Sequence, residues 1–467
     1  MKTLWLTTYT FNWSRGSVHW LAMESLPGIN DLNQPLTGVG GDDEYHRLSI
    51  LQGSEWNIEI SSETRLTIRV ISGIAEIFGT ELAIGKEYNF RNYKFGVYAV
   101  EDVELEWRCP ELTGETLSIS PNSTAKLVYN LHFALEKMRS SSFDGPRVMI
   151  VGETNSGRTT LSRTLCSYGI KFKSYQPMYV NLDPQQAIFS PPGCVTAIPI
   201  SDILDVQCST WGQSMTSGAT ALHSKQPVVK NYGLERLSEN KQLYLDVVEQ
   251  LATSVNGRLM NDSLVRRSGL VIDIPAISEL DEDNNDLEYF AKQFKVNVAV
   301  LVGISDNQKI DAIAKKLVPL VGNHIVNLPR ISGSVKPEDA FKRSLQRGAI
   351  REYFYGTPDT VLSPYAVGVG FEDVTVYRPK NVLEDTQEVP TQLLPVQVNP
   401  SNLQHALVAI SYADRKAAPE VIQKAPILGF ALITEVNDKR NKLRILLPVP
   451  GALPNKSMIL TSYRYLE

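Results

Sequence analysis

One ten-residue stretch, VGETNSGRTT at residues 151–160, limits the possible folds of this chain more than any other. It follows the apolar run RVMI and opens the helical pattern RTTLSRTLCSYG. A glycine-rich turn between a buried strand and a helix points successive backbone N–H groups at an anion, and the helix N-terminus adds partial positive charge. An ordinary strand-to-helix turn that happens to hold two glycines is the alternative. The spacing of Gly152, Gly157 and Thr159 favours a phosphate-binding loop, or P-loop, that binds a nucleotide.

The P-loop departs from the usual pattern at Arg158, where such loops carry lysine. Guanidinium keeps the positive charge, but it is a planar fork that needs more room than the thin lysine stem. Phosphate binding can survive this change, whereas catalysis of phosphoryl transfer depends on finer placement of charge. We assign nucleotide binding to nine residues of the loop: Gly152, Glu153, Thr154, Asn155, Ser156, Gly157, Arg158, Thr159 and Thr160.

Two aspartates end neighbouring apolar runs, Asp183 in YVNLDPQQ and Asp273 in LVIDIP. In a P-loop kinase Asp183 would be the general base or would hold a magnesium-bound water, and Asp273 would bind Mg²⁺ together with Thr159. Each aspartate has a plainer interpretation, because Asp-Pro at a strand end is also a common turn opener. The P-loop upstream favours the functional interpretation of both.

Two further segments are candidates for covering the site. Arg343, Arg347 and Arg351 recur at every fourth residue and so share one helical face. They form either a lid over phosphates or a solvated face, and the spacing alone favours the solvated face. Residues 208–233 are rich in Gly, Ser, Thr and Gln, and they form either a loop across the mouth of the site or a solvated connection.

The chain divides into three patterns. Residues 45–110 alternate apolar and polar positions between short turns, which predicts an antiparallel β-sandwich. A helix follows near 125–142, with Leu127, Leu131, Leu135 and Met138 on one face. From residue 147 onward, continuous apolar runs predict parallel strands buried on both faces. These runs are RVMIVG, PMYVNLD, SGLVIDIP, VNVAVLVG and HIVNLP.

After residue 355 the pattern returns to strands and ends in a hairpin whose turn contains Asn437 and Asp438. The sequence therefore predicts a multidomain α/β protein. Its parts are a disordered extension at 1–22, an N-terminal β-sandwich domain at 23–121, a central P-loop NTPase-type parallel αβα domain at 122–355, and a C-terminal mixed α/β domain at 356–467.

Composition excludes several other classes of protein. With 467 residues, 43% of them hydrophobic, the chain can bury large cores. A formal net charge of −5 argues against binding nucleic acid by bulk charge. The cysteines are scattered and the histidines show no metal-site spacing, so we expect a reducing compartment and no histidine-bound metal. No apolar run is long enough to span a membrane.

Taken together, these residues resemble the family of the pre-mRNA cleavage factor IA subunit that is related to eukaryotic polyribonucleotide 5′-hydroxyl kinases, in particular its budding-yeast-type members. The resemblance runs from Met23 through nearly the whole chain. Besides the P-loop, it is carried by GIAEIFGTEL, NLDPQQAIFSPPGC, RRSGLVIDIP, IREYFYGT with LSPYAVGV, PSNLQHALVAIS and SMILTSYRYLE.

The resemblance implies ATP and Mg²⁺ at the centre of the molecule, with the N-terminal domain enclosing the nucleotide base through Glu55 and Lys94. It also implies a nuclear protein of pre-mRNA 3′-end cleavage and polyadenylation. The implied partners are the cleavage factor IA scaffold subunit that binds the RNA polymerase II tail, the other cleavage factor IA subunits and, indirectly, pre-mRNA. It implies no membrane role.

Three catalytic elements depart from the kinase-active members of this family. Those members carry lysine at Arg158, a Thr-x-Gly-Trp clasp where this chain reads IPAI at 274–277, and arginines where it has Gln346 and Ala349. Arg343 and Arg351 match the kinase lid, and with Asp183 they are the candidate, now vestigial, catalytic residues.

We therefore expect an ATP-binding, non-catalytic scaffold subunit. The first alternative is an active polyribonucleotide 5′-hydroxyl kinase that transfers the γ-phosphate of ATP to RNA. The second is a nucleotide-switched module unrelated to RNA, which copurification with cleavage-factor subunits would rule out.

We predict that residues 1–22 are dispensable, because their apolar residues lack a sustained period and precede a polar, turn-rich stretch. The sequence leaves open whether Met1 or Met23 is the start. Deleting residues 1–22 should leave the melting temperature and partner binding unchanged. A clear loss of folding on this truncation would contradict the prediction.

Overall fold

The computed structural model describes residues 45–110, 117–173, 175–211, 226–334, 339–357, 361–385 and 391–466. The extension expected at 1–22 lies outside these ranges, as does the middle of the segment 208–233. Among the described residues, none of the helices combines the length and the apolar character that a membrane span requires.

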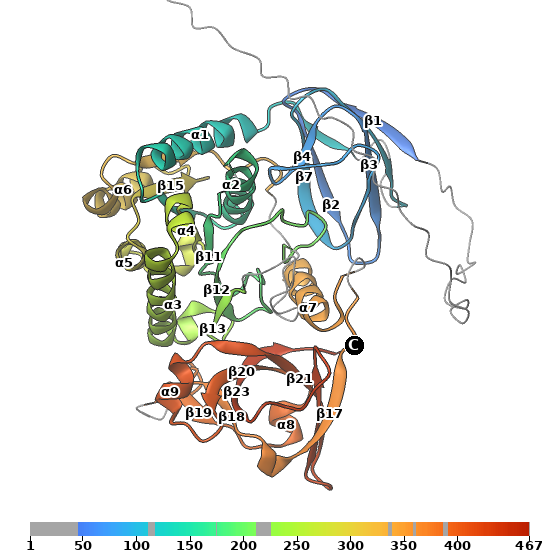
Figure 1. Ribbon diagram of the computed structural model, residues 1–467, viewed down its shortest axis with the longest axis vertical. Helices are drawn as coiled ribbons and strands as arrows, with labels where there is room; N and C mark the ends of the chain where they lie inside the picture. The colour runs from blue at the N-terminus through green and yellow to red at the C-terminus, as the bar shows by residue number, and fades with distance from the viewer. Residues whose placement is uncertain are drawn as a thin grey trace, which may run out of the picture. The chain divides into compact units, whose positions relative to one another are not determined.

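Residues 46–108 and 118–120 form the predicted antiparallel β-sandwich (Figure 1, blue). One sheet has the strand order β1-β8-β3-β6 and the other β5-β4-β7-β2-β9. Alternation explains the packing: in β2, Trp56, Ile58 and Ile60 are buried in the core between the sheets and the residues between them are not. The strand bounds are β1 His46–Ile50, β2 Glu55–Ile60, β3 Leu66–Ser72, β4 Ala75–Ile77, β5 Thr80–Glu81, β6 Glu87–Phe90, β7 Tyr93–Ala99, β8 Val103–Arg108 and β9 Ser118–Ser120.

A seven-stranded sheet forms the centre, with the order β13-β12-β11-β14-β10-β15-β16. Its five parallel strands are the five runs predicted from the sequence. They are β10 Arg147–Gly152, β11 Met178–Asn181, β14 Leu270–Asp273, β15 Val298–Val302 and β16 Ile325–Leu328. The two antiparallel strands at one side of the sheet, β12 (Cys194–Pro199) and the edge strand β13 (Val228–Asn231), were not predicted.

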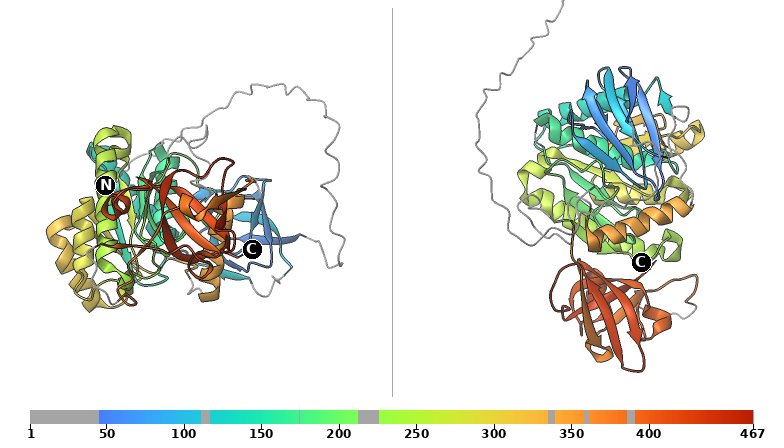
Figure 2. Two further views of the ribbon diagram at one scale, coloured as in Figure 1. Left: turned by 90° about the horizontal axis from the view of Figure 1, so that it is seen from below. Right: turned by 90° about the vertical axis from the view of Figure 1, so that its right-hand side faces the viewer.

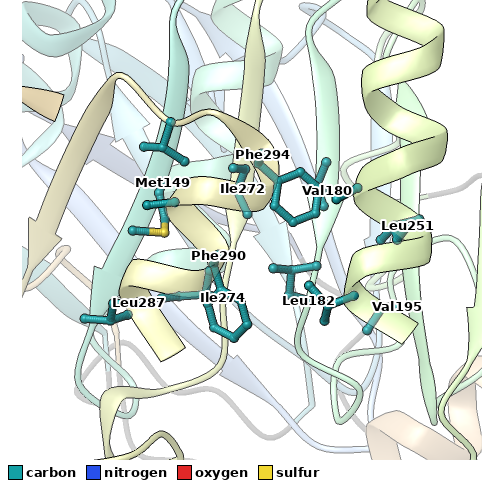
Figure 3. Close-up of a cluster of buried hydrophobic side chains, with 14 of the residues drawn as sticks. Met149, Val180, Leu182, Val195, Leu251, Ile272, Ile274, Leu287, Phe290 and Phe294 are labelled. Carbon is teal, nitrogen blue, oxygen red and sulfur yellow. The ribbon is translucent and has the colours of Figure 1, made fainter. Parts of the chain in front are cut away.

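Helices cover both faces of the central sheet. One core joins the sheet to α3 (Lys241–Asn261), α4 (Ser263–Ser268), α5 (Asn285–Phe294) and α6 (Asn307–Val321). Figure 3 shows part of it, where Phe290 and Phe294 of α5 meet Met149 and Ile272 of the strands. The other face is covered by α1 (Ala125–Ser141) and α2 (Arg158–Lys173).

Helix α1 lies one position away from the face expected from its leucines. Leu131 and Leu135 are buried as predicted, but Leu127 is 41% exposed and Val128 takes its place in the core. The helix buries a polar residue as well, since Arg139 donates from Nε to the backbone oxygen of Ser268 at 2.8 Å. Hydrophobic spacing alone therefore misplaced the face by one residue.

The C-terminal part is a second seven-stranded sheet, with the order β17-β22-β21-β20-β23-β18-β19 (Figure 2, red). The predicted hairpin is present, but Asn437 is the last residue of β21 and pairs with Lys442 of β22, so of the two predicted turn residues only Asp438 lies in the turn. The strand bounds are β17 Tyr365–Gly370, β18 Val376–Pro379, β19 Leu393–Pro395, β20 Ala406–Asp414, β21 Ile427–Asn437, β22 Lys442–Leu447 and β23 Lys456–Arg464. The short helices α8 (Pro400–Leu403) and α9 (Pro419–Lys424) complete this part.

A shared core joins the C-terminal sheet to the central part. The end of α7 (Asp339–Tyr355), through Ile350, Tyr353 and Phe354, packs with residues of β12, β13 and the C-terminal strands. Backbone contact adds to this core, because the Ser462 N–H donates to the Gly233 oxygen at 2.8 Å. The C-terminal sheet thus docks at β12 and β13, the two strands that were not predicted from the sequence.

Candidate nucleotide-binding site

The P-loop connects β10 to α2 at the carboxyl end of the parallel strands, and its glycines are required by close approaches. Gly157 has φ +91°, and a Cβ there would lie 2.5 Å from Cβ of Ile331 and 2.6 Å from Oγ of Ser334. A Cβ at Gly152 would lie 2.5 Å from the backbone oxygen of Val302. Any larger side chain would therefore push the loop away from β15 and from the loop after β16.

Arg158 folds back over its own loop. Its Nη1 donates to the backbone oxygens of Gly152 at 2.9 Å and Glu153 at 2.7 Å, and its Nη2 lies 3.9 Å from Oδ2 of Asp183. The side chain is 8% exposed. One of the terminal nitrogens is thus committed to the loop, which leaves Nη2 as the nitrogen nearest Asp183.

The other loop residues are held from several sides. Glu153 pairs with Lys309 at 2.9 Å, the Thr154 hydroxyl lies 3.0 Å from that of Ser278, and Asn155 adopts φ +59°. The backbone oxygen of Ser156 accepts a hydrogen bond from Ile331. The hydroxyl of Ser156 is buried without a hydrogen-bond partner among the described residues.

Two neighbouring cavities meet at the P-loop. The first, the phosphate cleft, is lined by the loop, Asp183, Glu279 and one face of α7. The second, the base cavity, lies between the N-terminal sandwich and α2. Lys94, Thr160 and Gly333 line both cavities. A ligand with two chemically different ends can therefore occupy both.

Glu55 and Lys94 both line the base cavity. The Glu55 carboxylate accepts a hydrogen bond from the Ser123 hydroxyl at 2.5 Å. Burial raises the pKa of Glu55, whereas its hydrogen bonds with Ser123 and Ser332 lower it. Lys94 pairs with Glu59, and its Nζ lies 4.6 Å from the centre of the Phe341 ring on α7. Lys94 thus reaches from the sandwich to the helix above the cleft.

Three acidic groups gather around the phosphate cleft and its floor. Burial raises the pKa of Asp183, with Arg158 opposing this effect. The pKa of Glu279 is raised to about 7, first by burial and then by the like charge of Asp183. The pKa of Asp273 is raised to about 6 by burial, while Arg158 and Thr159 lower it. A cation here would relieve the repulsion among these acids.

Asp273 and Thr159 are suited to hold a magnesium ion with a phosphate. Asp273 is 1% exposed and accepts from the Tyr179 hydroxyl at Oδ2, but its Oδ1 has no hydrogen-bond partner among the described residues. Mg²⁺ is usually bound by one or two protein oxygens together with substrate phosphates and waters. The described residues contain no group of three or more His, Cys, Asp or Glu that could hold a metal by itself.

The face of α7 that lines the cleft is not its arginine face. The cleft is lined by Phe341, Lys342, Leu345, Gln346 and Ala349. Lys342, which the sequence analysis missed, lies next to the predicted Arg343 in the chain, and its charge acts on Asp183.

The three arginines of α7 lie elsewhere. Arg343 lines a cavity that adjoins the cleft, together with Arg236 and Glu279. Arg347 donates to the backbone oxygen of Leu466 at 3.0 Å, and the Arg351 guanidinium lies 5.8 Å from the Tyr355 ring. Of the segment 208–233, Ser209 lines the cleft and residues 212–225 lie outside the described ranges.

A glycine-rich anion-binding turn, a parallel sheet and a buried aspartate at the end of the adjacent strand define a P-loop nucleotide-binding protein. Family models match all three parts: the N-terminal beta-sandwich domain of polyadenylation factor at 49–142, the mRNA cleavage and polyadenylation factor CLP1 P-loop at 152–356, and the pre-mRNA cleavage complex II protein Clp1 at 362–467. The chain belongs to the CLP1 family of mRNA cleavage and polyadenylation factors.

Relatives and solved structures agree with this assignment. The mRNA cleavage and polyadenylation factor CLP1 of Vanderwaltozyma polyspora is 59% identical over 453 residues, which cover 95% of this chain and all of the relative. A solved complex of wild-type Clp1p with Pcf11p is similar with a TM-score of 0.88 at 55% identity, covering 92% of this chain and all of that one.

A second solved structure, also with a TM-score of 0.88 at 55% identity, covers 91% of this chain and all of the other. It is described as showing an extended interface between Pcf11p and Clp1p and the structural basis for ATP loss in a glycine-to-arginine point mutant.

Glu352 of α7 supplies a test of how this helix is held. It accepts a hydrogen bond from the Thr210 hydroxyl, and burial, with the nearby charge of Asp205, raises its pKa from 4.5 to about 7. A carboxyl whose folded-state pKa is raised favours folding while it is protonated, so this contribution falls as pH rises from about 4.5 to about 7.

We therefore predict that Glu352→Gln, which keeps the acceptor oxygen and removes the charge, stabilises the protein at pH 8 by at most about 3 kcal/mol. Thermal unfolding at pH 5 and pH 8 measures this, and the gain should be larger at pH 8. Glu101→Gln, at an exposed position, is the control and should show no such difference. An equal effect at both pH values would contradict the prediction.

Proposed function

We propose that this protein holds ATP and Mg²⁺ as a structural ligand, without transferring phosphate, and acts as a nuclear scaffold subunit of the 3′-end cleavage and polyadenylation machinery. The family assignment supports the process and, through it, the nuclear location. The P-loop and the adjoining base cavity support nucleotide binding. The proposal also keeps ATP as the nucleotide, because a solved relative is described in terms of ATP loss.

The residues fit such a ligand. The loop N–H groups and the start of α2 would hold the phosphates, and Thr159 and Asp273 would hold the magnesium ion. Glu55 and Lys94 would meet the base or ribose in the second cavity. Bound Mg²⁺ would place a compensating positive charge near the carboxyl groups of Asp183, Glu279 and Asp273.

The conformation of Arg158 carries the non-catalytic part of the proposal. Its Nη1 is committed to two loop oxygens and its Nη2 lies near Asp183, so its charge is drawn toward the loop and the candidate base. Among the described residues of α7, Lys342 is the only basic side chain that lines the cleft. Phosphoryl transfer needs several positive groups around the transferring phosphate, and this cleft supplies few.

An active 5′-hydroxyl kinase remains the second candidate, and Asp183 is the observation that favours it. This carboxyl is 4% exposed, lines the cleft, and has a pKa raised by burial, as expected of a general base. The adjoining cavity with Arg236 and Arg343 offers space beside it. Phosphate transfer to RNA is the measurement that separates the two candidates.

The partner in our proposal is a Pcf11p-like scaffold subunit, the kind of protein found with the solved relatives. By the family resemblance it is the subunit that binds the RNA polymerase II tail, and the other cleavage factor IA subunits and pre-mRNA are reached through it. We propose that bound nucleotide supports this association by stabilising the central domain.

We predict that purified protein contains ATP, and that Thr159→Ala combined with Gly157→Ala removes both the nucleotide and most of the partner affinity. The first change deletes a magnesium ligand, and the second places a Cβ 2.5 Å from Ile331. A ligand bound only by the folded state at a hundredfold excess over its Kd stabilises it by about 2.7 kcal/mol. Chromatography of released nucleotide and calorimetry with the partner measure these effects.

The matched control is Thr253→Ala with Gly257→Ala on α3, where Thr253 is exposed and a Cβ at Gly257 meets nothing within 4 Å. It should retain ATP and partner binding. Wild-type partner affinity in a nucleotide-free P-loop variant would separate the two properties and contradict the coupling. Wild-type protein without nucleotide, and with no melting shift on adding Mg-ATP, would remove the central claim.

We predict that kinase activity is absent and that Arg158→Lys does not restore it. Losses of ~3 kcal/mol at each of two independent elements multiply to roughly 10⁴-fold in rate, and the lid and clasp residues remain altered. The variant should bind ATP at least as well as the wild type. It should transfer no measurable phosphate from γ-labelled ATP to a 5′-hydroxyl RNA oligonucleotide. Labelling by the wild type that Asp183→Asn abolishes would establish the kinase instead.

A further inference from the structure

The turn Phe78–Gly79 of the N-terminal sandwich is pressed against the P-loop helix beside the base cavity. Both residues have positive φ, +49° for Phe78 and +75° for Gly79, and both line the cavity. A Cβ at Gly79 would lie 2.8 Å from the Tyr168 ring and 3.1 Å from the Thr164 backbone oxygen, both on α2. A left-handed phenylalanine is uncommon, so surrounding contacts must hold this turn in place.

Arg163 supplies the main contact. It is 1% exposed, and its guanidinium carbon lies 4.6 Å from the centre of the Phe78 ring. The centre of the Trp211 ring also lies 5.5 Å from the same carbon. A guanidinium over aromatic faces is stabilised by their negative π-surfaces, more strongly when it is shielded from water.

The hydrogen bonds of Arg163 join three segments of the chain. From α2, it donates to the Tyr93 hydroxyl of the sandwich at 2.5 Å and to the Asp205 backbone oxygen of the loop after β12 at 2.5 Å. Within the described residues no carboxylate lies within 4 Å of its nitrogens. A buried charge held by neutral acceptors is costly to disturb, because any gap leaves it unsolvated.

A cluster of hydrogen bonds around Glu76 also holds the strand before this turn against α1 and α2. The Glu76 carboxylate, 2% exposed in β4, accepts from Tyr129 at 2.8 Å, from Tyr168 at 3.0 Å and from Lys171 at 2.8 Å. These partners lie on α1 and α2. Between this cluster and Arg163, the Phe78 side of the base cavity is held on the P-loop helix.

We propose that Phe78 is a wall of the nucleotide-base site and that Arg163 is the residue that positions it, so that this pair controls how slowly bound nucleotide leaves. The inference rests on the proposed function, since it concerns the same nucleotide. The base cavity is lined by the Phe78–Gly79 turn of the sandwich and by Thr164 and Tyr168 of α2, so movement of the turn away from α2 would widen the path by which nucleotide leaves. The Arg163–Phe78 contact resists that movement.

The experiment measures the dissociation rate of a fluorescent, ribose-labelled ATP analogue from the full-length protein, chased with unlabelled ATP. Arg163→Lys retains charge but loses the planar fork that contacts Phe78, Tyr93 and Asp205 together. Phe78→Leu removes the aromatic face and keeps an apolar wall. Each variant should release the analogue about tenfold faster than the wild type, which corresponds to about 1.4 kcal/mol.

Arg139→Lys is the matched control. Arg139 is also 1% exposed, donates to a backbone oxygen and lies 5.5 Å from the Tyr175 ring, but it lines neither cavity. It should destabilise folding as Arg163→Lys does while leaving the release rate within about twofold of the wild type. A similar acceleration in this control would show a general loss of stability and overturn the proposal.

The double variant Arg163→Lys/Phe78→Leu tests whether Arg163 acts through Phe78. Residues that act through one contact are not additive, so the pair should release the analogue about tenfold rather than about a hundredfold faster. A hundredfold effect, or release at the wild-type rate by both single variants, overturns the positioning role. If Arg163→Lys does not fold, the Phe78→Leu rate decides. A wild type that binds no analogue contradicts the proposed function itself.

Discussion

The packing of helix α2 between the central sheet and the N-terminal sandwich is the constraint on which the rest of the structure depends. Its apolar side, with Leu161, Leu165 and Cys166, lies on the sheet, and its N-terminus forms the end of the P-loop. Its polar side, with Arg163 and Tyr168, meets the sandwich. One helix therefore positions the phosphate-binding loop and one wall of the base cavity at the same time.

The charges around the phosphate cleft underlie our proposal that this protein binds nucleotide without transferring phosphate. Burial raises the pKa of Asp183, Glu279 and Asp273, and the charge of Asp183 raises the pKa of the other two further, so the cleft favours a bound cation. Arg158 and Lys342 supply positive charge, but Arg158 is partly committed to the loop. Such a site can hold a magnesium–phosphate group firmly without stabilising the charge that develops during transfer.

The cavity arrangement links nucleotide to domain organisation. Lys94 comes from the sandwich, Thr160 from α2 and Gly333 from the loop after β16, and all three line both cavities. The end of α7 shares a core with the C-terminal sheet, while its first turns line the cleft. A ligand at this junction would contact elements from the N-terminal and central parts, and our proposal of a structural role for nucleotide rests on this arrangement.

The sequence by itself determined the P-loop, the five parallel strands and the sandwich, because each is written in local spacing: glycines in a turn, continuous apolar runs, and alternation. The sequence also predicts that Asp183 and Asp273 lie at one edge of the sheet, because neighbouring parallel strands end at a common edge. Only the tertiary structure decided which face of α7 meets the cleft. Lys342 and Arg343 are adjacent in the chain, and packing of Ile350 and Phe354 turns the first toward the cleft.

Tertiary packing alone also determined where the Arg158 and Arg163 side chains lie. Both are basic residues on one helix, and nothing in their spacing distinguishes a side chain that folds over its loop from one buried against Phe78 and Tyr93. The same holds for Glu55, whose hydrogen-bond partners Ser123 and Ser332 lie far away in the chain. Local sequence specifies backbone elements because their hydrogen bonds are local, whereas the partners of a buried charge come from segments that only folding brings together.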